Sequence, residues 1–520
     1  MKPSISSLSA LLLLWGALLL LATASGHLHS PDGEINFRTA RSLATTATYA
    51  IPPYPAGFGS KAGLDGKEYA QYGPLQPLLA VPHYIIGKIT ADSLPAEWLS
   101  AQADRMSRTV GFYRPLVGGR SEFPGLYPPD HTERVTRIAV SFFNPIVTWL
   151  TVMLLLMWSR HFYGDRLAAL MLPLVYLLAS YAWPHSRPFY SEPLATLFLL
   201  LAVVLADRLA GGPFSVAKVF GLAVCVGTSA GLAILTRIDS AVAVFGIAWI
   251  AIARLRRKDL PYTTHQKTLA VALGIAAFLV VGGIQPMLNL SRFGALLASG
   301  YADQAEGIRF SIPWLDSLKI YLLTPGKSLI AYSPPVLVAI LLWPTFFRRD
   351  RHLAIGCSLI LLGYLLIIGR WQNLGGWCWG PRHLFQMTVF LLLPLPLLFG
   401  PDITGRLRLR WTWLLAGTVI LGVAIQFMGV LVDYMWPLDR ILRVLPPGED
   451  TPWMLNNFGP LIHLGSWHFD RDPDWFLVDL WRSGATGARF VSGVIWAVWI
   501  LLSVWLVTRA SQRFRTRNQG

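Results

Sequence analysis

The sequence predicts an all-α polytopic membrane protein on three observations. The chain of 520 residues is 54% hydrophobic and only 14% charged. Its apolar runs recur along the chain and approach the ~20 residues that a helix needs to cross about 30 Å of hydrocarbon. Its formal charge of +16 lies mostly in short segments beside these runs. This placement is typical of membrane orientation and does not indicate nucleic-acid binding.

About twelve membrane helices are predicted from these runs. Their ranges are 8–25, 134–158, 167–184, 189–207, 216–235, 238–253, 268–288, 328–346, 353–369, 384–400, 411–430 and 491–508. The first run precedes Ala-Thr-Ala-Ser-Gly, so it is either an uncleaved anchor, which fits the charge distribution better, or a cleaved signal peptide. Three cysteines, two of them inside apolar runs, indicate neither a disulfide framework nor a structural metal site.

Short basic loops alternate along the chain and predict its orientation. Segments such as SRHFYGDR, ARLRRKDLPYTTHQK and FFRRDRH are in register with the basic C-terminal tail, so both termini are expected in the cytoplasm. The long segments then fall on the outer face. The predicted organisation is a first transmembrane helix (1–25), an outer loop with an acidic pair and an interfacial helix (26–133), a transmembrane core (134–430) with outer loops 289–327 and 370–383, an outer loop (431–490), and a last helix with its basic tail (491–520).

The first outer loop begins with an acidic pair in SPDGEINFRTARSL. Pro-Asp-Gly favours a turn, so Asp32 could cap a helix that begins near Glu34. Two carboxylates beside Arg38 and Arg41 at a bilayer surface also suit a base that deprotonates a hydroxyl, with cations that hold a phosphate leaving group. Both interpretations stay open from local chemistry.

Two further outer segments carry charge next to apolar sequence. Lys61 precedes YGPLQPLLAVP, which is too short to span and predicts a helix that lies along the membrane surface. Glu192 stands at the mouth of an apolar helix, where a carboxylate should face protein or a water-filled cavity, unless it serves only as an N-terminal helix charge.

Two motifs near the later spans are candidate ligand sites. Lys327 in TPGKSLIAYSPP resembles the end of a P-loop, but Tyr321 stands where that motif requires glycine. A lysine at a helix start suits phosphate contact or simple snorkelling. The alternate aspartates of HFDRDPDW, at 470, 472 and 474, are interpreted as a solvated loop.

The loop GRWQNLGGWCWGPRHL holds more aromatic and basic residues than a connector needs. Trp377 and Trp379 offer ring faces for a sugar, and Arg382 offers a planar fork for phosphate oxygens. The alternative is an aromatic belt at the membrane interface with a Gly-Pro turn.

Several of these motifs occur together in one order. The acidic pair after the first span, the interfacial helix, a Ser-Glu-Pro-Leu corner, LTRID, TPGKSLIAYSP and GGWCWGPRHL resemble the GT-C superfamily of polytopic glycosyltransferases. The sequence is most similar to the bacterial branch related to protein mannosyltransferases and to the lipid A aminoarabinose transferase. The resemblance covers residues 10–400. The segment 90–133 has no counterpart in it, so the resemblance leaves the acceptor open.

The resemblance implies transfer of one sugar from a polyprenyl-phosphate donor to a lipid, glycan or protein acceptor on the outer face of a bacterial inner membrane. It implies that Asp32 is the catalytic residue, with Glu34 as the nearby second acid. We expect Asp32 to act as the base in a single displacement, which inverts the anomeric centre. The resemblance places the donor phosphate at Lys327, Arg382, Arg237 and Arg187. We assign the donor sugar or lipid to Trp377, Trp379, Glu192 and Lys61.

Two points stay open in this hypothesis. A divalent cation, Mg²⁺ or Mn²⁺, could bridge Asp32 and the phosphate, but the sequence shows no full ligand set. A transporter or flippase of lipid-linked saccharides would also need a basic, aromatic outer cavity. It would further need a route to the cytoplasmic side, yet the predicted inner loops are short and basic.

Overall fold

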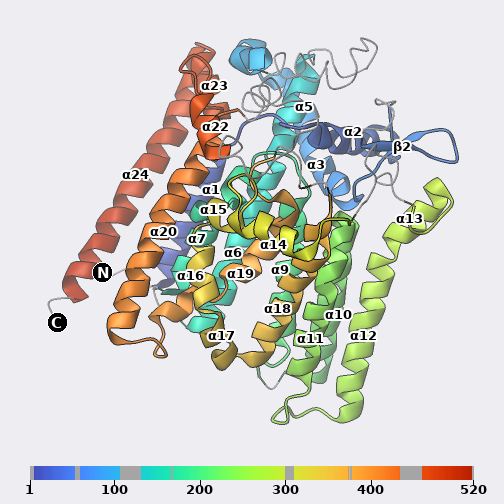
Figure 1. Cartoon of the computed structure of the whole chain (residues 1–520). Coiled ribbons are helices and arrows are strands. Elements are labelled where there is room, and N and C mark those ends of the chain that lie inside the picture. The colour runs from blue at the N-terminus through green and yellow to red at the C-terminus, as the bar shows by residue number, and fades with distance from the viewer. Residues whose placement is uncertain are drawn as a thin grey trace.

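The protein is a bundle of helices with one small sheet, as the computed structural model shows (Figure 1). The structure describes residues 5–52, 59–105, 130–164, 168–212, 214–298, 310–372, 374, 378–433 and 459–517. This architecture confirms the predicted all-α polytopic class.

Helices occupy all twelve predicted spans. Their bounds are α1 (Ile5–Ala22), α5 (His131–Ser141), α6 (Phe143–Tyr163), α7 (Ala168–Ala179), α9 (Glu192–Arg208), α10 (Val216–Thr236), α11 (Val244–Leu255), α12 (Thr264–Gly282), α13 (Ile284–Phe293), α15 (Leu329–Tyr332), α16 (Val336–Leu341), α17 (Trp343–Arg349), α18 (Arg351–Leu366), α19 (Phe385–Leu392), α20 (Gly405–Leu431) and α24 (Thr486–Arg517). Among the described residues, eight helical segments are long and apolar enough to cross a membrane, and α1 and α7 are shorter apolar helices.

The predicted span 328–346 is not one continuous helix. It consists of α15, α16 and α17 in sequence. Pro334 and Pro335 separate the first two, and Pro344 lies at the start of the third. A proline lacks the N–H that a continuing helix would donate, and its ring clashes with the preceding turn, so these positions break the helix.

Glycines set the closest contacts between neighbouring spans. A Cβ atom placed on Gly227 of α10 would lie 1.9 Å from the carbonyl oxygen of Gly274 in α12. A Cβ atom on Gly246 of α11 would lie 2.3 Å from the carbonyl oxygen of Gly356 in α18. Small residues let membrane helices approach until their backbones touch, which gives dispersion contacts that lipid tails do not provide.

The helix α12 has the least protein around it among the central spans. Only 11% of the most apolar window of the α12–α13 segment is buried, and α12 stands at one side of the bundle in Figure 1. Leu279 and Val280 are exposed apolar residues on this helix. Such a surface is expected to face lipid.

One end of the bundle carries almost all of the remaining structure, and we call it the elaborated end. It contains α2 (Pro31–Thr46), α3 (Leu75–Thr90), α8 (Ala182–His185), α14 (Trp314–Leu323), α22 (Gly459–Gly465), α23 (Phe476–Arg482), and the antiparallel strands β1 (Ala50–Ile51), β3 (Glu68–Ala70) and β2 (Ser60–Ala62), paired in that order. Both chain termini lie at the opposite end (Figure 1).

The helix α3 occupies the segment for which an interfacial helix was predicted. Leu78, Leu79, Ile86 and Ile89 are exposed apolar residues on it, while its other face packs on α2 and α5. An amphipathic helix of this kind suits the boundary between lipid and water.

Candidate functional site

The acidic pair lies in the first turn of α2. Ser30 is the N-cap of this helix, and its hydroxyl accepts a hydrogen bond from the backbone N–H of Gly33 at 3.1 Å. The interpretation of Asp32 as the cap is therefore wrong, because serine two positions earlier takes that role and the helix begins at Pro31. Asp32 is left to make tertiary contacts.

Arg382 binds the Asp32 carboxylate. Its guanidinium lies 2.8 Å from Asp32 Oδ2, and its Nε donates to Glu192 Oε1 at 2.5 Å. The same guanidinium lies 3.7 Å from the centre of the Tyr190 ring. Arg382 is thus held between two acids and an aromatic face, and the structure brings together three of the residues singled out from the sequence.

A tyrosine completes the surroundings of Asp32. The Tyr72 hydroxyl donates a hydrogen bond of 2.7 Å to Asp32 Oδ1. The next residue, Gly73, packs against the end of α10, where an added Cβ atom would lie 2.2 Å from the carbonyl oxygen of Thr236. Glycine at 73 therefore lets the loop with Tyr72 lie directly on the backbone next to Arg237.

Glu192 joins Arg382 to a second arginine. It is fully buried at the start of α9, and its Oε1 also accepts a hydrogen bond of 2.9 Å from Arg237. Arg237 forms a second ion pair with Asp239 at 2.7 Å. Glu192 therefore faces protein cations, as expected for a carboxylate at the mouth of an apolar helix.

Lys327 lies against the loop that precedes Arg382. Its Nζ donates to the backbone carbonyls of Cys378 and Gly380, each at 3.4 Å. Arg382 also approaches the Cys378 sulfur, at 3.5 Å. The structure therefore places the Lys327 ammonium and the Arg382 guanidinium around the same short loop.

A cavity of about 230 Å³ opens beside these charges. Its wall includes Arg237, Asp239 and Ser191, and it includes Gln71 and Gly73 on either side of Tyr72. Phe310, Ile368 and Trp371 give it an apolar side. A cavity with charged groups on one side and apolar groups on the other suits an amphipathic ligand.

We call Asp32, Tyr72, Glu192, Arg237, Lys327 and Arg382 the central cluster. With Asp239, it contains three carboxylates and three cations. The cations are presented by loops and helix ends from distant parts of the chain, which is the usual origin of a ligand site on a rigid scaffold.

Glu34 has partners of its own. Arg137 donates to its carboxylate at 2.9 Å, and Arg38 donates at 3.1 Å. Although burial alone would raise its pKa, Arg137 and Arg38 lower the pKa of Glu34 to about 2. This carboxylate is held by two arginines, and no contact of Glu34 with the central cluster occurs among the described residues.

The structure does not bring Arg187 or Lys61 to the central cluster. Arg187 donates to the carboxylate of Asp474. Lys61 lies on β2, with its ammonium 5.3 Å from the centre of the Phe293 ring. The predicted phosphate contact of Arg187 and the predicted donor contact of Lys61 therefore have no geometric support here.

The tryptophan loop is only partly described. Trp377 lies outside the described residues. Trp379 is buried, donates through its indole nitrogen to Gln426 Oε1 at 3.0 Å, and packs edge-on against Tyr332 and His463. Trp379 thus packs inside the protein, where it offers no exposed ring face to a sugar.

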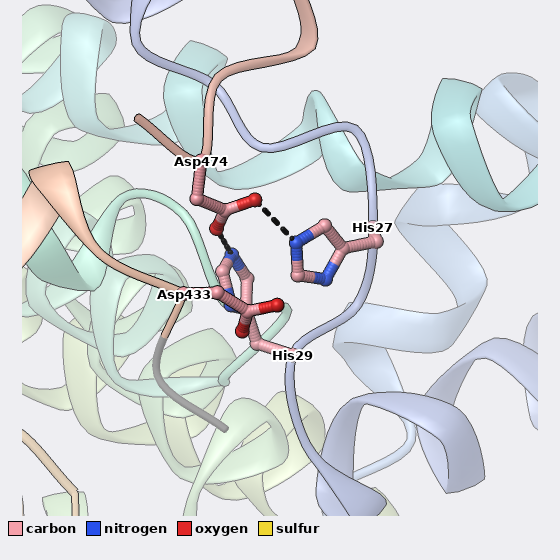
Figure 2. A group of neighbouring side chains, drawn as sticks. All are labelled: His27, His29, Asp433 and Asp474. Atoms are coloured by element: carbon pink, nitrogen blue, oxygen red, sulfur yellow. Dashed lines mark hydrogen bonds and ion pairs between the residues drawn. The ribbon is translucent and has the colours of Figure 1, made fainter. Parts of the chain in front are cut away.

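A second polar cluster forms where three distant segments meet (Figure 2). His27 and His29 follow α1, Asp433 follows α20, and Asp474 precedes α23. All four side chains are buried. The expectation of a solvated loop is wrong at Asp472 and Asp474, because both are buried, while Asp470 is exposed. Alternate spacing alone could not show that other segments cover this loop.

Tyr72, Asp239, His27, His29 and Asp433 are members of these two clusters that the sequence analysis does not predict. Tyr72 stands in the quoted segment before the interfacial helix, and Asp239 is the last residue of LTRID, so position near a motif was the available signal. His27 and His29 form a His-x-His step immediately before the acidic pair. Their two acids come from residues more than 400 positions later, so no local pattern joins them.

Comparisons with known proteins locate the fold. No protein-family profile and no curated protein matches the sequence. The apo crystal structure of ArnT from Cupriavidus metallidurans is 14% identical, with 96% of this chain and 74% of that chain covered at a TM-score of 0.51. ArnT bound to undecaprenyl phosphate gives 0.49 over 96% and 75%. The Archaeoglobus fulgidus oligosaccharyltransferase in its apo form is 12% identical and gives 0.44 over 85% and 58%.

The apo ArnT structure matches nearly the whole length of this chain. The chain is a multi-pass membrane protein with the GT-C-like fold of ArnT.

Proposed function

We propose that the protein is a glycosyltransferase that moves a single sugar from a polyprenyl-phosphate donor to an acceptor at the elaborated end of the bundle. The observation that carries the proposal is the ion pair between Asp32 and Arg382, 2.8 Å apart, at a site that also holds Arg237 and Lys327. It supplies a carboxylate base and a cation for a leaving phosphate in one place.

The proposed donor fits the chemistry around the central cluster. A polyprenyl phosphate has an apolar tail for the bilayer and a charged head for the membrane surface. Arg382, Arg237 and Lys327 provide cations for that head, and the neighbouring cavity has an apolar wall. ArnT, whose apo form shares this fold, has also been solved bound to undecaprenyl phosphate.

The proposed reaction is one displacement at the anomeric carbon. Asp32 takes the proton of the acceptor hydroxyl while the acceptor oxygen forms its bond to the sugar. The bond between the anomeric carbon and the phosphate oxygen breaks, and its electrons remain on the phosphate. Arg382 stabilises that charge, and attack from the opposite face inverts the anomeric centre.

Glu192 has a positioning role in this proposal. It is buried and binds Arg382 and Arg237 through a single oxygen, so it fixes the distance between the two cations. The Tyr72 hydroxyl donates to Asp32 Oδ1, while Arg382 pairs with Asp32 Oδ2. Together they restrict the rotation of the Asp32 carboxylate. Catalytic groups held by such partners need less reorganisation in the transition state.

The direct test is transfer by the purified chain in liposomes that contain a panel of polyprenyl-phosphate sugars. We expect Asp32→Asn to abolish transfer and leave expression and detergent stability nearly intact. Asp316→Asn is the matched control, because Asp316 is half exposed on α14 and forms an exposed ion pair with Lys319. Retained transfer by Asp32→Asn would overturn the assignment.

The same liposomes test the competing transporter. A flippase would move lipid-linked saccharide across the bilayer without forming a new glycosidic bond. Asp32 would then have no chemical step to catalyse. Movement of the lipid without product in the wild-type chain would therefore reject the transferase proposal.

A further inference from the structure

The four-residue cluster in Figure 2 has the geometry of a metal site. His27, His29, Asp433 and Asp474 each offer one ligand atom, and these four atoms lie within 4.8 Å of one another. The side chains are 3%, 4%, 2% and 0% exposed, respectively. Two imidazoles and two carboxylates that converge in a buried place could exchange their mutual contacts for a shared cation with small side-chain movements.

The backbone presents the two histidines to one point. Gly26 and His29 both have positive φ, 71° and 63°. A non-glycine residue rarely adopts this conformation, and such outliers occur more often at functional sites. The turn brings the imidazole rings of His27 and His29 to 4.0 Å between centroids.

Backbone hydrogen bonds hold the three segments together. The N–H of Phe476 donates to the carbonyl of Ala24 at 2.7 Å, and the N–H of Asp474 donates to the carbonyl of Leu431 at 3.0 Å. An added Cβ atom on Gly26 would lie 2.7 Å from the Phe476 side chain, so this contact is available only to glycine. The ligand atoms therefore lie on a framework that other contacts already fix.

The donor set indicates a class of metal. Nitrogen from imidazole together with carboxylate oxygen suits zinc and similar divalent transition metals, whereas Mg²⁺ and Ca²⁺ prefer oxygen ligands alone.

We propose that His27, His29, Asp433 and Asp474 form a binding site for one divalent transition-metal ion of the zinc class. This site differs from a divalent cation that would bridge Asp32 and the donor phosphate. Among the residues that the structure describes, the group suited to a metal is this one, and it does not include Asp32. The proposal stands independently of the proposed transferase activity.

Two arginines share the acids of this cluster. Arg105 lies 3.2 Å from Asp474 and 2.9 Å from Asp479, and Arg187 pairs with the other oxygen of Asp474. Arg105 also lies 3.8 Å from Asp433, and Arg482 lies 3.9 Å from Asp479, so three guanidiniums balance the three carboxylates of this group. A carboxylate oxygen has lone pairs for both a metal and an arginine, so these ion pairs leave Asp433 and Asp474 able to bind a metal as well.

A metal at this place would fix the chain segment that leads to Asp32. His29 precedes the N-cap Ser30 directly, and Asp32 follows two residues later. Asp433 and Asp474 follow His29 by more than 400 residues. The ion would thus join the start of α2 to the segments after α20 and before α23.

The test measures metal in the purified full-length chain. After dialysis against metal-free buffer, we expect about one zinc per wild-type chain by mass spectrometry, and less than about a tenth in the His27→Gln, His29→Gln double variant. His468→Gln is the matched control, because this exposed histidine lies on the same loop as Asp474. It should keep the wild-type metal content.

A second measurement uses only the wild-type chain, so it does not require the double variant to fold. Cobalt added to the metal-stripped wild-type chain should give the visible absorption of a four-coordinate ion, and zinc should raise the midpoint of thermal denaturation while Mg²⁺ should not. Zinc content no higher than in the double variant, with a six-coordinate cobalt spectrum, would overturn the proposal. The cluster would then be an ion-pair network of histidine, aspartate and arginine.

Discussion

Arg382 contacts Asp32, Glu192 and the Tyr190 ring at once, so its planar guanidinium should not be replaceable by another cation. In Arg382→Lys, a single ammonium cannot bind both acids and also stack on the ring. We expect transfer to fall about tenfold to a hundredfold, mainly in turnover, because the charge matters most as the phosphate leaves. The measurement is turnover with saturating polyprenyl-phosphate sugar.

Arg370→Lys is the control for this variant. Arg370 lies at the other end of the same loop, where it donates to the carbonyl of Ile312 and lies over the Trp314 ring. If both substitutions reduce turnover equally, Arg382 has no special role in the reaction.

Glu34 allows a prediction on pH. Its pKa is lowered from 4.5 to about 2 in the folded chain, so its ion pairs stabilise fully above pH ~4.5 and are lost as the pH falls toward 2. We expect the free energy of unfolding of the wild-type chain to fall by on the order of 2 kcal/mol over this range. The midpoint of thermal denaturation should fall with it. Glu34→Gln should be less stable at pH 7 and less sensitive to acid.

The exposed Glu97 provides the comparison for this measurement. Glu97→Gln should keep the wild-type pH dependence, since its side chain is exposed on η2 (Ala96–Leu99). The same loss of stability in acid for Glu34→Gln and the wild-type chain would show that the pairs with Arg38 and Arg137 contribute little.

At the scale of elements, Trp379 in the loop between α18 and α19 is expected to contribute to stability and not to donor binding, because it is buried. In Trp379→Phe, Gln426 Oε1 loses its donor inside the protein, which should cost about 1–3 kcal/mol of stability. Activity per folded molecule should change little. Trp343→Phe loses a comparable indole hydrogen bond, to Ser358, at a half-buried site, so its loss of stability should be smaller.

These two variants are to be compared by thermal denaturation and by the dependence of transfer on donor concentration. A normal denaturation midpoint for Trp379→Phe with a raised KM for donor would restore the interpretation of this residue as part of a donor cradle.

The close contact between α10 and α12 allows a second prediction at the scale of elements, on stability. In Gly227→Ala, the added methyl group would lie 1.9 Å from the Gly274 carbonyl, so the helices must separate, at a cost of about 2 kcal/mol. Gly221→Ala lies on the same helix with no atom within 4 Å, and alanine has the better helix propensity. Denaturation midpoints should fall for Gly227→Ala and stay level or rise for Gly221→Ala.

The elements themselves could be predicted far better than their side-chain partners. The apolar runs indicated twelve helical spans, because the bilayer sets their length and composition. The start of α2 was misplaced, since Ser30 and Asp32 are both good capping residues and only the fold shows that Arg382 and Tyr72 engage the second. Trp379 looked like an interface residue because its partner Gln426 belongs to another helix.

For the whole molecule, both termini at one end of the bundle agree with the alternation of basic loops, and this gives a prediction on sidedness. A reporter that is active only in the cytoplasm should function when fused to either terminus, and one that is active only outside should not. The opposite result would place the elaborated end, and the proposed active site with it, in the cytoplasm.

Because α12 is largely exposed, its two faces should differ in the substitutions that they tolerate. Positions such as Leu279 and Val280 face away from the protein, so any apolar residue should serve there, and only a charge should be excluded. Gly274 lies against the backbone of α10, and no larger residue fits there without moving a helix. Within one helix, the chain is therefore permissive on one face and nearly invariant on the other, so its mutational tolerance should follow the helical period.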